Sequence, residues 1–189
     1  MRETTDTRAR IQEIALKLFT EQGYEATSLR EIAESLGVTK AALYYHFRTK
    51  DDIVASLAED RQAMVERLIK WGQEQPRTIE TRREFVRRYA DQLYGGHHHA
   101  FMRFMERNQT ALRDHPKVEK MRNLMTSLVG ILWDEGDSTA QRLRSSMAIF
   151  TLHAAWLLLK DEDLADEERK AAALEVALEL IERCPAAGH

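Results

Sequence analysis

The sequence predicts an all-α protein, and three observations support this fold class. The 189 residues include only 3 prolines and 8 glycines, too few turn formers for an all-β sandwich or barrel. Strong helix formers, such as alanine, leucine, glutamate and arginine, dominate long stretches of the chain. Hydrophobic residues make up 43% and charged residues 31%, which is the balance of a globular chain and not of a disordered one.

The first three helices are expected within residues 1–48. A helix over residues 6–23 carries apolar residues at the spacing of one helical face, and Gly23 ends it. Ser28 and Glu31 form a capping box that opens the second helix. A glycine turn and a short third helix complete this head.

The rest of the chain is expected to be helix after helix, separated by short breaks with glycine, proline or aspartate. Its first helix follows the head directly, with no glycine-rich or proline-rich linker between them. We therefore expect two domains, 1–48 and 49–189, and about nine helices in all. The six helices of the second domain are expected over residues 49–71, 78–94, 97–108, 116–133, 138–159 and 163–183.

Residues 29–47 carry a helix-turn-helix signature, in which a short turn begins at Gly37 between two helices. In this motif the first helix braces against the DNA backbone and the second lies in the major groove. Residues 37–50 hold three cations and no acidic residue, which favours an anionic partner. The alternative is a tight helical hairpin within an ordinary bundle. Five residues fall within an arc of about 140° and form one outward face: Lys40, Ala41, Tyr44, Tyr45 and Arg48.

A wider stretch, residues 14–53, resembles the DNA-binding domain of the TetR (tetracycline-repressor) family of bacterial regulators. The centre of this stretch is LREIAESLGVTKAALYYHFRTKDDIV. The rest of the chain resembles the family only in length and helical content. The resemblance rests on a combined pattern of Gly23-Tyr24, Thr27, Ile32-Ala33, Leu36-Gly37-Val38, Leu43-Tyr44, Phe47 and Lys50.

The resemblance also implies which residues contact DNA. Thr39 is expected to bind a phosphate from the start of the third helix, and His46 and Lys50 to hold the DNA backbone. Ala42 stands where the family often has threonine, and Tyr45-His46 inverts a frequent His-Tyr order, so the operator sequence stays open. The full set of expected DNA contacts is Ser28, Arg30, Thr39, Lys40, Ala41, Ala42, Tyr44, Tyr45, His46 and Lys50.

The last two long helices carry apolar surface suited to pairing with a second copy. Residues 147–159 are apolar all round, so they must be buried on more than one side. The family pairs through its last two long helices as an antiparallel four-helix bundle, and a two-fold dimer suits a reader of two half-sites. Burial within a single chain would produce the same pattern and stays an alternative. The residues expected at the dimer interface are Leu152, Ala155, Trp156, Leu159, Leu174, Leu178 and Ile181.

Between the head and the last two helices, the chain is rich in methionine and aromatic residues. Ligand pockets are mostly apolar with a few polar anchors, and methionine-rich walls adapt to different ligands. An ordinary core would produce the same stripes, and His153 fits either a satisfied core histidine or a pocket position. The residues expected to line a ligand site are Phe85, Tyr89, His98, Phe101, Met102, Met105, Met121, Met125, Phe150 and His153.

Three consecutive histidines, His97 to His99, follow two glycines. Consecutive residues cannot share one helical face, so the three do not form a facial metal triad by themselves. Solvated histidines at a helix start, a hydrogen bond to a ligand and a metal site are three alternatives. The single cysteine, Cys184, excludes an intramolecular disulfide and a thiol metal cluster. We expect no metal and no cofactor.

These observations lead to one principal hypothesis, a homodimeric transcriptional regulator. We expect a repressor that a small-molecule ligand releases from a palindromic operator in double-stranded DNA. The alternative is a helical carrier of a small molecule or metal, with an incidental basic head. The HEXXH, GXSXG and Walker A patterns are missing, so we do not expect an enzyme. The N-terminus lacks an apolar signal segment and the longest uncharged apolar stretch has 13 residues, so we expect a cytoplasmic protein without a membrane span.

Overall fold

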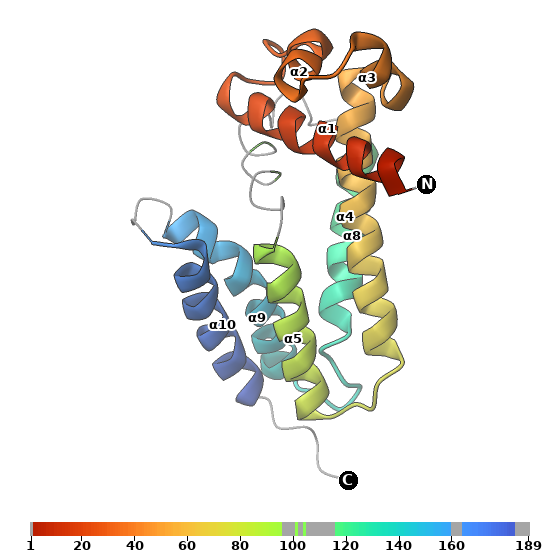
Figure 1. Cartoon of the computed structure of the whole chain (residues 1–189). Helices are drawn as coiled ribbons and strands as arrows, with labels where there is room; N and C mark the ends of the chain where they lie inside the picture. Colours follow the sequence, from red (N-terminus) through yellow and green to blue (C-terminus); the bar gives the residue numbers. More distant parts are fainter. Residues whose placement is uncertain (1, 96–100, 102–103, 105–115, 160–163, 184–189) are drawn as a thin grey trace. The chain divides into compact units, whose positions relative to one another are not determined.

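The computed structural model describes residues 2–95, 101, 104, 116–159 and 164–183, with the backbone alone for residues 2–6 and 116–122. These residues form α-helices joined by short turns and contain no β-strand, so the all-α prediction is confirmed. Figure 1 labels the helices, which are α1 (Arg2–Glu21), α2 (Leu29–Leu36), α3 (Lys40–His46), α4 (Lys50–Gln73), α5 (Ile79–Tyr94), α8 (Pro116–Gly130), α9 (Thr139–Leu158) and α10 (Asp166–Glu182).

The described helices number eight, against the expected nine. The difference is the helix expected over residues 97–108, of which the structure describes only Phe101 and Phe104. Two helix starts differ from the expected ones by more than one residue: α1 begins at Arg2 and α10 at Asp166, because apolar spacing does not mark the first turn of a helix. Within the described ranges, none of the helices is long and apolar enough to cross a membrane.

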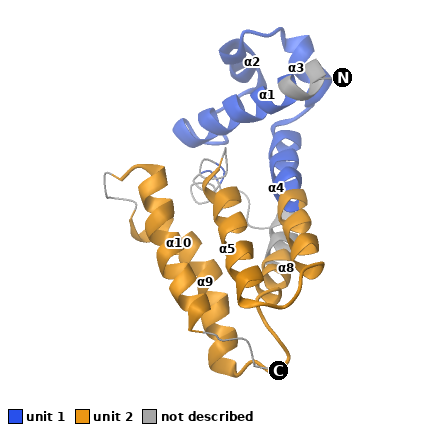
Figure 2. Cartoon of the chain, turned by 60° about the horizontal axis from the view of Figure 1, so that its bottom comes forward, with its two compact units in different colours: residues 1–62, 97–120 blue, residues 63–96, 121–189 orange. Residues whose placement is uncertain are grey.

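The chain divides into two compact units, which Figure 2 shows in separate colours. Unit 1 consists of residues 1–62 and 97–120, and unit 2 of residues 63–96 and 121–189. The domain boundary expected after residue 48 lies next to the start of α4. The boundary between the two units lies later, after residue 62, so unit 1 includes the first turns of that helix. Helix α4 contributes to both units without a break in its hydrogen-bonded structure.

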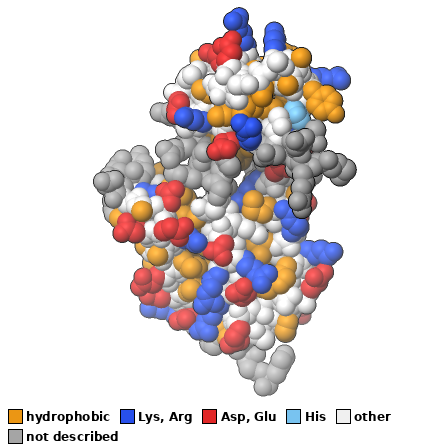
Figure 3. All heavy atoms as spheres, viewed as in Figure 1, with side chains coloured by type: hydrophobic (Ala, Val, Ile, Leu, Met, Phe, Trp, Pro, Cys, Tyr) orange, Lys and Arg blue, Asp and Glu red, His pale blue; other side chains and the backbone are white. Residues whose placement is uncertain are grey.

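The surface of unit 2 carries mixed charge. On the face that Figure 3 shows, basic and acidic side chains are interspersed over the described residues of this unit. Several of them form pairs across helices, such as Lys170 with Asp91 at 3.0 Å and Arg83 with Glu182 at 2.9 Å. Interspersed charges of both signs produce a weak field at a distance, so this surface is a poor electrostatic guide for DNA.

Unit 1 is built around an apolar core from α1, α2, α3 and the first turns of α4. Three aliphatic side chains are fully buried in it: Ile32 of α2, Leu43 of α3 and Ile53 of α4. Phe19 of α1 is also fully buried and packs edge-on against Tyr24, with ring centroids 5.1 Å apart. The core therefore fixes the angle between α2 and α3, because each helix is anchored in it by an aliphatic side chain.

A buried amide joins α1 to α4 inside unit 1. Gln12 Nε2 donates to Ser56 Oγ at 2.9 Å and to Asp60 Oδ2 at 2.7 Å. The Ser56 hydroxyl donates in turn to the Ile53 carbonyl at 2.8 Å. A buried amide costs free energy unless it is hydrogen-bonded, so these bonds fix the register of α1 along α4.

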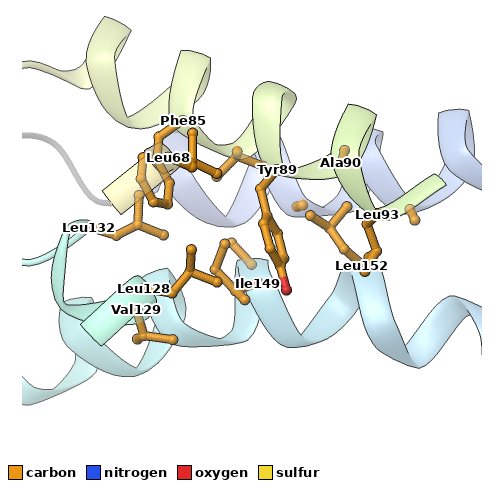
Figure 4. Packing of buried hydrophobic residues seen from close by; sticks show 14 of the residues in the cluster. Leu68, Phe85, Tyr89, Ala90, Leu93, Leu128, Val129, Leu132, Ile149 and Leu152 are labelled. Carbon is orange, nitrogen blue, oxygen red and sulfur yellow. The ribbon is translucent and has the colours of Figure 1, made fainter. Parts of the chain in front are cut away.

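Unit 2 packs α5, α9 and α10 against one another, and the second half of α4 and the end of α8 complete its core. Figure 4 shows Tyr89 extending from α5 into this core between Ile149 and Leu152 of α9. Gly72 marks a close approach of α4: a Cβ there would lie 2.7 Å from Ile131 Cγ2 and 2.9 Å from the Phe85 ring. Any larger residue at position 72 would force these neighbours apart.

A buried ion-pair cluster connects the start of α5 to the turn between α8 and α9. The Arg82 side chain is 3% exposed, and its Nη2 donates to the carboxylates of Asp134 and Asp137, the latter at 3.3 Å. Asp137 Oδ2 also accepts the Asp134 backbone N–H at 2.8 Å. Buried charges require partners, so the cluster holds this turn in one conformation against α5.

Candidate nucleic-acid interface

The first helix of the candidate interface, α2, begins with the capping box expected from the sequence. The Ser28 hydroxyl accepts the Glu31 backbone N–H at 3.2 Å, and the Glu31 carboxylate accepts the Ser28 hydroxyl at 2.8 Å and its backbone N–H at 2.7 Å. The bonds from the Ser28 hydroxyl and N–H hold the pKa of Glu31 below its usual value. The Ser28 hydroxyl, expected to contact DNA, is exposed and already serves as the cap.

The turn between α2 and α3 depends on one left-handed residue. Gly37 has a φ of 72°, and its N–H donates to the Glu34 carbonyl at 3.1 Å. The Val38 N–H donates to the Ala33 carbonyl at 3.0 Å. These two bonds form a Schellman ending, which glycine adopts without the steric cost that a Cβ brings. The direction in which α3 leaves the turn therefore depends on Gly37.

Helix α3 has one buried side and one exposed side. Thr39 caps its start by accepting the Ala42 N–H at 3.2 Å. Leu43 is fully buried and Phe47 is 3% exposed, so both anchor α3 in the core of unit 1. That this face contacts DNA stays a prediction. The exposure of five residues confirms the predicted outward face of Lys40, Ala41, Tyr44, Tyr45 and Arg48.

Two tyrosines and a lysine provide the hydrogen-bonding groups of this face. Tyr44 is 41% and Tyr45 79% exposed, and the Lys40 ammonium lies 5.4 Å from the centroid of the Tyr44 ring. His46 is half-buried, with its ring edge-on to Tyr45 at a centroid distance of 5.3 Å. Hydroxyl and ammonium groups are donors to both phosphate oxygens and base edges. The face can therefore both hold a DNA backbone and read bases.

Arg30 lies on the exposed side of α2, where it pairs with a residue of its own helix. Its Nε is 2.7 Å from Glu34 Oε1, and both side chains are mostly exposed. Exposed pairs contribute little stability, so Arg30 can exchange this carboxylate for a phosphate at small cost. The i, i+4 spacing of Arg30 and Glu34 is the sequence signal that indicates such a pair.

Lys50, expected to hold the DNA backbone, is engaged within the protein. Its Nζ donates to the backbone carbonyls of Tyr24 at 2.6 Å and Glu25 at 3.2 Å, and lies 4.6 Å from the Tyr24 ring centroid. The next residue, Asp51, accepts the Tyr24 hydroxyl. Burial and this hydrogen bond raise the pKa of Tyr24. These contacts could not be predicted from the sequence, because no local pattern relates residues so far apart in the chain.

Several residues expected to line a ligand site meet in unit 2. Phe85 and Tyr89 are 0% and 1% exposed in its core, and Met125 is half-buried against the same cluster. The Tyr89 hydroxyl lies 2.8 Å from His153 Nε2. This bond agrees with the interpretation of His153 as a satisfied core histidine. A role in ligand binding stays a prediction for these four residues.

The other residues expected at the ligand site lie apart from this group or outside the described residues. Phe101 is buried in the core of unit 1, where its ring centroid is 6.3 Å from that of Phe104. Phe150 is 46% exposed on α9. Helical spacing can indicate that a side chain such as Phe101 is buried, but it does not show which neighbours bury it. The unit to which Phe101 belongs could therefore not be predicted. His98, Met102, Met105 and the Met121 side chain lie outside the described residues.

Three residues expected at the dimer interface belong to the core of unit 2. Leu152 and Ile181 are fully buried and Ala155 is 7% exposed within a single chain. A side chain that its own chain already covers offers no surface to a second copy. For these three, the structure therefore favours the alternative, burial within one chain. The sequence could not reveal this, because a helix that is apolar all round does not indicate which side faces its own chain.

The remaining four expected interface residues are half-buried and also contact their own chain. Trp156 stacks on Tyr94 with ring centroids 5.2 Å apart, and the Arg169 guanidinium lies 4.7 Å above its ring. Burial raises the pKa of Tyr94 to about 12. The others, which pack against the same core cluster, are Leu159, Leu174 and Leu178.

A different side of α9 is apolar and exposed, and we call it the outer face. At about 100° per residue its members fall within an arc of about 100°, away from the buried side of the helix. Val176 of α10 is exposed as well. None of the residues of this face was among those expected at the dimer interface, and Phe150 was expected at the ligand site instead. The outer face consists of Leu143, Met147, Phe150, Leu157 and Leu158, which are 44% to 75% exposed.

Metal ligation has no candidate among the residues that can be placed. In the described ranges, no three side chains of His, Cys, Asp or Glu come together as a group that could hold a metal ion. His97 to His99 lie outside those ranges.

The sequence of the first quarter of the chain matches known regulators. Residues 11–57 match the family described as "Bacterial regulatory proteins, tetR family". The chain is 46% identical over 57 residues to the HTH-type transcriptional regulator AcrR of Shigella flexneri and 42% identical over 57 residues to TtgR of Pseudomonas putida. These matches cover 30% of this chain but only 26% and 27% of the two relatives, so the likeness spans about a quarter of their length.

The fold of almost the whole chain is similar to that of solved regulators. A transcriptional regulator of Aquifex aeolicus superposes with a TM-score of 0.69 at 21% identity, covering 93% of this chain and 99% of that one. The regulator PfmR of Thermus thermophilus superposes with a TM-score of 0.64 at 25% identity, covering 90% and 97%. The similarity of fold thus extends well beyond the segment in which the sequences are alike.

Proposed function

We propose that the chain is a sequence-specific DNA-binding transcriptional regulator, because residues 11–57 match the family described as "Bacterial regulatory proteins, tetR family" and are similar to known regulators. We propose that it acts as a repressor and that a small molecule releases it from a palindromic operator. The relatives with similar sequence are transcriptional regulators, which supports binding and not catalysis as its mode of action.

The observation that carries this proposal is the outward face of α3. Leu43 and Phe47 anchor one side of the helix in the core, and Tyr44 and Tyr45 remain exposed on the other. Exposed rings of this size contribute little to the apolar core of unit 1, but they can enter the major groove. Lys40 adds an ammonium beside Tyr44.

The outer face of α9 supports a homodimer. Leu157 and Leu158 are 61% and 75% exposed, and Val176 of α10 is 48% exposed. A contiguous apolar surface of this kind marks an interaction site in a soluble protein. The proposed occupant is a second copy of this chain, because two-fold symmetry lets two α3 helices read successive major grooves about 34–36 Å apart. This face replaces the core residues of α9 as our proposed interface.

We propose that the ligand acts through α4. Ile53 and Ala58 of this helix are buried in unit 1, whereas Val65 and Leu68 are buried in unit 2. A ligand that binds unit 2 in one conformation better than in another would shift the population of that conformation. The continuous helix α4 would carry this shift to the helix-turn-helix and change the spacing of the two α3 helices.

The alternative of a small-molecule carrier is not favoured, because the family match lies in the helix-turn-helix itself. The two functions differ in their response to salt. DNA binding releases counterions and weakens steeply as the salt concentration rises, whereas capture of an apolar ligand does not. Since chromosomal DNA is the proposed partner, we also propose a cytoplasmic location.

The decisive experiment is the selection of bound sequences from a pool of random duplex DNA with the purified full chain. We expect enrichment of an inverted repeat, with half-sites one helical turn apart or a multiple of it. The enriched duplex then allows ligands to be screened by release of the protein. If a folded dimer enriches no sequence at low salt, the proposed function is wrong.

A further inference from the structure

The last two helices of unit 2, α9 and α10, carry opposite charge. Helix α9 contains two arginines and no acidic residue, whereas α10 contains six acidic and two basic residues. The outer face of α9, together with the exposed Val176 of α10, is the apolar surface at which we propose the dimer. Charges beside this surface decide how a second copy can lie against it, because like charges in contact are unfavourable.

Most of these charges have partners within their own chain. Arg142 Nη2 donates to the Glu135 carbonyl at 3.1 Å, and Glu182 accepts from Arg83 at 2.9 Å. Glu168 accepts a backbone N–H at the start of α10 at 3.1 Å. Three exposed side chains have no ion-pair partner among the residues that the structure describes: Arg144 of α9, and Glu175 and Glu179 of α10.

Glu175 and Glu179 are unfavourable neighbours within their own helix. They are four residues apart on one side of α10, and like charges at this spacing destabilise a helix. Glu179 also lies in the last turn, which contains no basic residue, and the negative end of the helix dipole repels a carboxylate there. A cation supplied from outside the helix would offset both costs.

Arg144 and Glu179 lie beside the apolar surface, at the same end of the two helices. At about 100° per residue, Arg144 is about 40° from the edge of the outer face and Glu179 about 60° from Val176. Arg169, in the first turn of α10, donates to the Leu159 carbonyl at the end of α9 at 3.2 Å. The two helices, which lie side by side in Figures 1 and 2, are therefore antiparallel. Charges in this position belong to the polar rim that surrounds the apolar centre of an interface.

We propose that Arg144 of one copy pairs with Glu175 and Glu179 of the partner subunit when the outer faces come together. Helix α9 has no carboxylate, so of these two helices only α10 can complement Arg144. A two-fold interface contains each contact twice, so the pairing joins α9 of each copy to α10 of the other. The proposal rests on the proposed dimer, and it names the charges that select the packing of the two copies.

Charge reversal tests this pairing. We expect Arg144→Glu to dimerise at least about tenfold more weakly than wild type, because both contacts of its dimer then bring carboxylates together. The chain with Glu175→Lys and Glu179→Lys, which we call the lysine variant, should weaken similarly because it opposes Arg144 with ammonium groups. Sedimentation over a range of protein concentrations measures both affinities against wild type.

The decisive measurement is an equimolar mixture of Arg144→Glu with the lysine variant. Both contacts of this heterodimer join opposite charges, so it should form in excess over random exchange of subunits. Native mass spectrometry of differently tagged chains measures the proportions. The excess should shrink as the salt concentration rises, because exposed charges are screened.

A matched control reverses an arginine outside the apolar surface. Arg87 is exposed on α5, and Arg87→Glu should exchange with the lysine variant at random. If the lysine variant does not fold, Glu179→Lys alone takes its place in both mixtures.

Two results would overturn the pairing in a protein that is a dimer. One is random exchange between Arg144→Glu and the lysine variant. The other is a preference of Arg144→Glu for wild-type chains over random exchange, which would show that the two Arg144 side chains face each other. A wild-type protein that sediments as a monomer would contradict the proposed dimer together with the pairing, while the selection of duplex DNA still tests the proposed DNA binding by itself.

Discussion

The hydroxyl of Tyr89 lies 2.8 Å from Nε2 of His153, and this bond joins α5 to α9 inside unit 2. Tyr89 is 1% exposed, so its hydroxyl has exchanged water for a partner on another helix. The two rings are tilted, with centroids 5.7 Å apart. A buried hydrogen bond of this kind specifies how the two helices pack, and its polar atoms could also orient a ligand.

We expect Tyr89→Phe to destabilise the protein by about 1 kcal/mol, because His153 then loses its buried partner. The measurement is urea denaturation of four proteins: wild type, Tyr89→Phe, His153→Leu and the double variant. The double-mutant cycle should give a coupling energy of about 1 kcal/mol between the two residues. Additive effects of the two changes would show that the bond contributes nothing to stability.

Tyr44→Ala should abolish binding to the enriched duplex and leave the dimer intact. Tyr44 is 41% exposed on α3, so its removal changes stability by less than about 0.5 kcal/mol. A gel-shift titration measures affinity, and analytical ultracentrifugation verifies the dimer. Arg87→Ala removes an exposed side chain from unit 2 and serves as the control. Affinity of the Tyr44 variant within a few-fold of wild type would remove this residue from the interface.

Gly37→Ala should cost about 1–2 kcal/mol, because an alanine at a φ of 72° is strained even though the site has open space for a Cβ. DNA affinity should fall as well, since α3 leaves the turn at this residue. Gly130 of α8 also has open space around it but has no positive φ, so Gly130→Ala should be neutral or stabilising. Thermal denaturation of both variants checks the contrast; equal effects would contradict it.

Leu157→Glu should convert the dimer to a monomer of nearly unchanged thermal stability. Leu157 is 61% exposed in the single chain, and a carboxylate there would be desolvated at the proposed interface. Sedimentation of the variant over a range of protein concentrations measures the change.

Leu152→Ala, five residues earlier on the buried side of α9, is the contrasting variant. Because Leu152 is fully buried in its own chain, we expect a loss of about 2–5 kcal/mol in the free energy of unfolding. The Leu152→Ala molecules that are folded should still form dimers. A dimer that tolerates Leu157→Glu would exclude the outer face as the interface.

Arg82→Met should destabilise the protein by about 3–5 kcal/mol, because it leaves the buried carboxylate of Asp137 without its cation. Arg83→Met is the matched control, since Arg83 pairs with Glu182 at the surface and should contribute at most about 1 kcal/mol. Urea denaturation measures both. Adding Asp137→Leu to Arg82→Met should recover part of the loss; no recovery would mean that Asp137 is not the origin of the cost.

The sequence by itself determined the helix-turn-helix and its exposed face. The capping box of Ser28 and Glu31, the turn at Gly37 and the alternation of buried Leu43 with exposed Tyr44 are all relations within a few residues. Caps, turns and helical faces follow from backbone geometry over one or two turns, so a local pattern is sufficient to predict them.

Tertiary structure alone decided which partner each buried group meets. Lys50 bonds to the carbonyl of Tyr24, Phe101 is buried in unit 1, and Leu152 faces its own chain while Leu157 faces outward. In each case an apolar or cationic residue had several possible neighbours of the same chemistry. Periodicity shows that a side chain is buried, but the choice of neighbour depends on how distant segments pack, and packing is a property of the folded chain as a whole.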